Sequence, residues 1–148
     1  MTIKEQTWFH ALIYFIIATT LSGVFRLGLF DWHNKMTLPY GLTIVMKSIL
    51  EGIGPIAGAT IVLLTIKKKS DITFFGSKKT KSFIMVIIPI LLFTIFGGNN
   101  DQNLNRHYYG FIVGTSLTLY AVFEEYGWRG FLQNEFSNLK PFLRAIII

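Results

Sequence analysis

The sequence contains no cysteine. This absence excludes a disulfide framework, a thiolate metal site and a cysteine nucleophile. Charged residues are also scarce, at 15% of the 148 residues, whereas hydrophobic residues make up 51% and the mean hydropathy is +0.48. Because a soluble domain of ordinary composition carries about 25% charged residues, this composition indicates an integral membrane protein.

Acidic residues are fewer than basic ones, at 8 against 14, which gives a net charge of +6. Six of the lysines lie in the segment 67–82, which holds a single acid, Asp71. Lysines beside apolar segments favour a role in membrane orientation over nucleic-acid binding, so we expect no nucleic-acid partner. The positive-inside rule places this lysine-rich loop in the cytoplasm, and with it the N-terminus, two spans upstream.

Four apolar segments approach the ~20 residues that a membrane-spanning helix needs. They are residues 8–25, 42–66, 83–96 and 108–123. A further apolar segment begins at Pro141 and is too short to cross a bilayer before Ile148, so it lies in the interface or belongs to a longer protein; we favour truncation. The predicted fold is therefore all-α, a multi-pass transmembrane helical bundle of about four spans plus the start of a fifth, in the cell membrane.

Small and polar residues inside these segments predict how the helices pack. Gly54 and Gly58, and likewise Gly110 and Gly114, are spaced to put two glycines on one helix face, where a neighbouring backbone can approach. In the second segment, the basic and acidic residues at positions 47 and 51 are one turn apart, and we interpret them as a structural ion pair.

The most informative stretch is Glu124-Glu125-Tyr126-Gly127-Trp128-Arg129-Gly130, at the end of the fourth apolar segment. On a helix, Glu125 and Arg129 lie one turn apart in the favourable order for an ion pair. Glu124 is rotated from Glu125 by about 100°, so we expect it to project elsewhere and to have no partner. Such a pair could simply anchor the span, but one braced and one unbraced carboxylate also suit the activation of a water molecule.

Residues 123–133 resemble the first motif, Glu-Glu-x-x-x-Arg, of the CAAX prenyl protease and bacteriocin-processing (Abi) family of intramembrane endopeptidases. The likeness includes the aromatic residue before the acidic pair, the Gly-Trp within the motif and the Gly-Phe-Leu-Gln after the arginine. It implies an all-α bundle with a water-filled cavity. Residues 1–107 would form an N-terminal transmembrane region, and residues 108–148 a truncated start of the family domain.

The resemblance also implies roles for the motif residues. Glu124 would activate water for attack on a peptide bond, Glu125 would be the second glutamate, and Arg129 would hold the geometry and charge of the site. The substrate would be a peptide or a prenylated protein, and the family is often zinc-dependent. Its later histidine motifs lie beyond the chain end, so we expect the purified 148-residue chain to cleave no membrane peptide above a Glu124→Ala control.

The histidines of the chain do not replace those motifs. By the predicted topology, His33 and His107 lie on the outer side, and His10 beside Trp8 suits an interfacial anchor better than a metal ligand. Zn²⁺ would therefore have incomplete ligands here, because a catalytic zinc takes about three protein ligands.

Two classes of function remain open. The chain is an intramembrane endopeptidase of this family, or it is a non-catalytic membrane protein, such as a bacteriocin self-immunity or interaction protein. A transporter fits less well, because the helices show no internal repeat. In each case membrane lipids are expected partners, because the lysine-rich loop favours anionic head groups.

Overall fold

The computed structural model describes residues 3–28, 39–66, 78–101 and 103–147. Within these ranges the chain forms helices and short connections and contains no strand, so the predicted all-α class is confirmed. The elements are α1 (Ile3–Arg26), α3 (Tyr40–Thr65), α4 (Lys79–Phe96), α5 (Arg106–Glu125), the π-helix η1 (Tyr126–Leu132), α6 (Gln133–Glu135) and α7 (Pro141–Ile147).

Three of the described helices are long and apolar enough to cross a membrane, as a membrane protein requires. They are α1, from Gln6 onward, α3 and α4. The third segment is longer than its apolar run suggested, because α4 begins with a charged turn at Lys79 and has 18 residues. Helix α5 is not among the three, so a fourth span remains a prediction.

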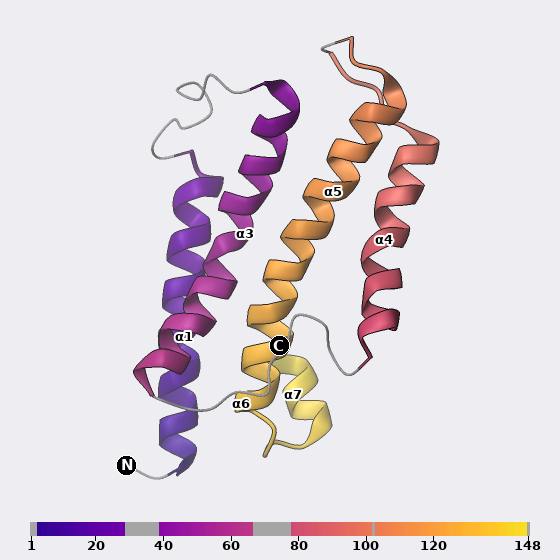
Figure 1. The fold of residues 1–148 in the computed structure, drawn as a ribbon. Coiled ribbons are helices and arrows are strands. Elements are labelled where there is room, and N and C mark those ends of the chain that lie inside the picture. Colours follow the sequence, from indigo (N-terminus) through magenta and orange to yellow (C-terminus); the bar gives the residue numbers. More distant parts are fainter. Residues whose placement is uncertain (1–2, 29–38, 67–77, 102, 148) are drawn as a thin grey trace.

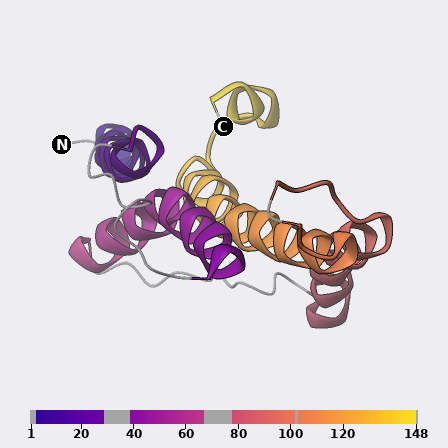
Figure 2. The same cartoon turned by 90° about the horizontal axis from the view of Figure 1, so that it is seen from above.

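The four long helices stand in one row, in the order α1, α3, α5, α4 (Figures 1 and 2). Helix α3 packs against both α1 and α5, and α4 packs against α5. Figure 1 shows four segments together at the lower end of the helices: the start of α1, the end of α3, the start of α4 and the segment η1 to α7. The predicted topology likewise places these segments together on one side of the membrane.

The paired glycines lie at the contacts between helices, as predicted. Gly54 and Gly58 face α1, and a Cβ added at Gly58 would lie 3.1 Å from the carbonyl oxygen of Tyr14. Gly110 and Gly114 face α4, and a Cβ added at Gly114 would lie 3.0 Å from the α4 backbone. Each pair therefore lets two helix backbones approach closely within the chain.

A cluster of aromatic rings packs η1 and Phe136, the residue after α6, against α1. Tyr14 is fully buried, and its ring centroid lies 4.9 Å from that of Phe131 in η1. At one end of this cluster Trp8 packs against Phe136, and their ring centroids also lie 4.9 Å apart. Aromatic pairs at such distances add stability beyond their buried area. This cluster therefore holds the segment that carries the acidic motif against α1.

Candidate functional site

The acidic motif lies within a continuous helical segment and does not end it. Helix α5 runs directly into η1 and α6, so residues 106–135 are helical throughout. The motif residues after Glu125 form the π-helix, and π-helical segments within α-helices often occur at functional sites. Gly127 permits the close approach there, because an added Cβ would lie 2.5 Å from the Tyr14 hydroxyl and 2.6 Å from the Pro55 carbonyl oxygen.

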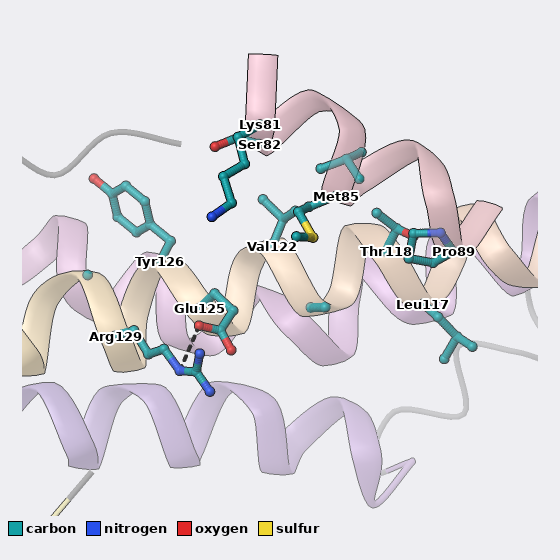
Figure 3. Close-up of a pocket in the computed structure, with 13 residues that line it drawn as sticks. Lys81, Ser82, Met85, Pro89, Leu117, Thr118, Val122, Glu125, Tyr126 and Arg129 are labelled. Carbon is teal, nitrogen blue, oxygen red and sulfur yellow. Dashed lines mark ion pairs between the residues drawn. The ribbon is translucent and has the colours of Figure 1, made fainter. Parts of the chain in front are cut away.

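The predicted ion pair between Glu125 and Arg129 is confirmed. Glu125 Oε2 lies 3.0 Å from Arg129 Nε, and both side chains are largely exposed (Figure 3). The pair joins the end of α5 to η1, and both residues line the same groove as Lys81 and Met85 of α4.

The expectation that Glu124 has no partner is wrong. Glu124 Oε1 lies 3.0 Å from Nη2 of Arg26, the last residue of α1. The same guanidinium donates to the hydroxyl of Tyr120, and that hydroxyl donates to Glu124 Oε1. The rotation of about 100° between neighbouring helical residues turns Glu124 toward α1, where the long side chain of Arg26 reaches it.

A small pocket of about 200 Å³ lies beside Glu124, between α1, α3 and η1. It is lined by Ala18, Thr19, Ser22, Gly23, Arg26, Pro55, Glu124 and Trp128. The Ser22 hydroxyl is buried and has no hydrogen-bond partner among the described residues. A cavity of this size with polar groups on its wall is large enough for water molecules.

The second predicted ion pair is also present. Lys47 Nζ lies 3.8 Å from Glu51 Oε1, one turn apart within α3. Neither residue lines the pocket beside Glu124, which supports the structural interpretation of this pair.

The described histidines are engaged away from Glu124. His10 Nδ1 lies 3.0 Å from Oε1 of the buried Glu135, which joins α1 to α6. His107 Nδ1 lies 2.9 Å from the carbonyl oxygen of Thr94, and His33 lies outside the described residues. Sequence reasoning missed this contact, since 125 positions separate the two residues, and the interfacial anchoring role of His10 stays a prediction.

A zinc ion does not fit the described residues. No group of three or more His, Asp or Glu side chains that could hold a metal ion occurs among the residues that the structure describes. The motif contributes two carboxylates, but each is paired with its own arginine. We therefore assign no chemical step to a metal.

No family model, curated protein or solved structure matches this chain. The likeness to the CAAX prenyl protease family therefore rests on residues 123–133. The contacts and the pocket of Glu124 described above do not depend on that likeness.

Proposed function

We propose that this chain is an intramembrane endopeptidase of the CAAX prenyl protease-like type, in which Glu124 activates a water molecule for attack on a peptide carbonyl. One observation carries the proposal. Glu124, the first acid of the motif, lies beside a pocket large enough for water and is held there by an arginine from another helix. Carboxylates among membrane helices are costly and are kept mainly at functional sites.

The contacts of Glu124 suit a general base. Arg26 and Tyr120 both bind Oε1 and fix the position of the carboxylate. Oε2 is then available to accept a proton from a water molecule in the pocket, while the Ser22 hydroxyl offers that water a second polar contact. The resulting hydroxide attacks the peptide carbonyl, and Glu124 passes the proton to the leaving amine.

The oxyanion formed in that attack needs a hydrogen-bond donor close to Glu124. The motif arginine does not supply it, because Arg129 is paired with Glu125 and does not line the pocket beside Glu124. The family resemblance gives this role to histidines of later motifs. In this proposal the pair of Glu125 and Arg129 stabilises the helix that carries Glu124. The protein has four membrane spans and a cytoplasmic N-terminus.

A second candidate is a non-catalytic membrane protein, such as an immunity or interaction protein. The observation that favours it is the same contact between α1 and α5. An ion pair between two helices is itself a structural link, and no described histidine contacts Glu124. In this case the motif would stabilise a helical surface that binds another protein.

Glu124→Gln separates the two candidates, with Glu51→Gln as a matched control in the ion pair of α3. Glutamine keeps an acceptor oxygen for Arg26 and Tyr120 but cannot take a proton at neutral pH. We would compare the peptides released from membranes of the cells that make the protein, by mass spectrometry and at equal protein level. Such membranes supply any partner chain that the site needs.

For a protease, at least one released peptide falls by about 10²–10⁴-fold in Glu124→Gln and stays unchanged in Glu51→Gln. Identical peptides in all three samples would show that the protease proposal is wrong. Immunity to a bacteriocin that survives Glu124→Gln would favour the non-catalytic candidate.

A further inference from the structure

A second and larger hollow lies on the other side of α5. It is a groove of about 840 Å³ between α4 and the segment α5–η1 (Figure 3). It is lined by Lys81, Ser82, Met85, Val86, Pro89, Leu117, Thr118, Ala121, Val122, Glu125, Tyr126, Arg129 and Gly130. None of these residues lines the pocket beside Glu124, so the groove is separate from the proposed catalytic site.

The groove is polar at one end and apolar along its length. The α4 wall begins with Lys81 and continues through Met85 to Pro89, which lie roughly 6 and 12 Å further along the helix at 1.5 Å per residue. The α5 wall adds Leu117 and Val122. Helix α4 is one of the three helices apolar enough to span a membrane, and its polar end coincides with the first turn of that span. The groove therefore starts at the depth of lipid head groups and runs into the hydrocarbon region.

The charge at the polar end favours an anion. Lys81 and Arg129 supply two cations against one carboxylate, that of Glu125, which is paired with the arginine. Lys81 has no ion pair within the described ranges, and its amino group points into the groove (Figure 3). The apolar wall is uncovered, because α4 has no buried residue.

We propose that this groove binds one anionic phospholipid. The phosphate lies at the end marked by Lys81 and Arg129, and an acyl chain lies along Met85, Pro89 and Val122. A soluble anion would leave the apolar walls uncovered, and a neutral lipid or an uncharged helix would leave Lys81 without a partner. An anionic phospholipid places a phosphate beside the cations and an acyl chain against the apolar walls, each at its ordinary depth in the bilayer.

The test uses the whole chain in lipid nanodiscs that contain a phosphatidylglycerol with a photoreactive diazirine in its acyl chain. After illumination, mass spectrometry measures the yield of lipid adduct and locates it on the sequence. The variant is Lys81→Glu. The matched control is Lys79→Glu, which makes the same change in net charge in the same helical turn at a residue that does not line the groove.

We expect adducts on Met85 or Val122, and a yield that falls at least fivefold in Lys81→Glu but less than twofold in Lys79→Glu. Fivefold corresponds to about 1 kcal/mol, the value of one lysine near an anionic lipid surface. Equal losses in the two variants, equal labelling by a phosphatidylcholine probe, or adducts confined to residues outside the groove would each overturn the proposal.

Discussion

The contact between Arg26 and Glu124 is the finding on which the proposed site depends most, and a double-mutant cycle tests it directly. Arg26→Met removes the guanidinium but keeps an unbranched side chain, and Glu124→Gln removes the charge but keeps the shape. If the ion pair exists, the double mutant is about as stable as either single mutant, because each single change already removes the attraction between the two charges.

The structure limits the coupling free energy expected between Arg26 and Glu124. Arg26 Nη2 and Glu124 Oε1 are 3.0 Å apart, and the two side chains are 47% and 33% exposed within the chain itself. Exposed ion pairs contribute about 0–1 kcal/mol, whereas breaking a buried pair costs about 3–5 kcal/mol. Polar contacts between membrane helices average about 0.6 kcal/mol and reach about 1.7 kcal/mol. For a partly exposed pair that also contacts Tyr120 we expect a coupling of about 0.5–1.5 kcal/mol.

The assay is equilibrium unfolding of the purified chain in mixed micelles as the fraction of denaturing detergent rises, followed by circular dichroism. The pair of Lys47 and Glu51 serves as the internal control, because its charged atoms are 3.8 Å apart and the basic residue precedes the acid. That arrangement predicts a coupling of less than about 0.5 kcal/mol. A coupling between Arg26 and Glu124 no larger than that of the control would refute the reasoning.

Two further predictions concern packing around the motif. Gly127→Ala should destabilise the chain by about 1–3 kcal/mol, because the new Cβ would lie 2.5 Å from the Tyr14 hydroxyl, whereas Gly23→Ala meets nothing within 4 Å and should gain up to about 1 kcal/mol. Equal unfolding midpoints for these two variants would contradict the close contact. His10→Ala removes a hydrogen bond from buried Glu135, so amide exchange in α6 should become faster at a cost of about 1–3 kcal/mol. Unchanged exchange there would mean that this contact does not hold α6 on α1.

Features set by neighbouring residues were readable from the sequence. The apolar segments predicted the long helices, and the glycine pairs predicted where those helices approach one another. The ion pairs of Lys47 with Glu51 and of Glu125 with Arg129 follow from helical spacing alone, because residues four positions apart share a helix face. Only the helical state of each segment had to be known for these predictions.

Features set by packing between distant segments were not readable in this way. Arg26 looked like the polar end of an apolar segment, and nothing in its surroundings in the sequence indicates a partner 98 positions away. A partial signal was present, because Tyr120 precedes Glu124 by four residues and a hydroxyl at that spacing shares its helix face. Glu124 was therefore not as isolated as its rotation from Glu125 suggested.

The divergence of the two adjacent glutamates narrows the chemistry that the motif can perform. Neighbouring carboxylates sometimes share one proton, but here Glu124 turns to α1 and Glu125 turns toward α4. Each is paired with its own arginine, so the two carboxylates do not form one site. Glu125 is paired along the helix and lines the groove beside α4, whereas Glu124 lines the smaller pocket between α1, α3 and η1, where the buried Ser22 hydroxyl also lies. In the proposed function, hydrolysis depends on Glu124, and Arg26, outside the motif, is the residue that positions its carboxylate.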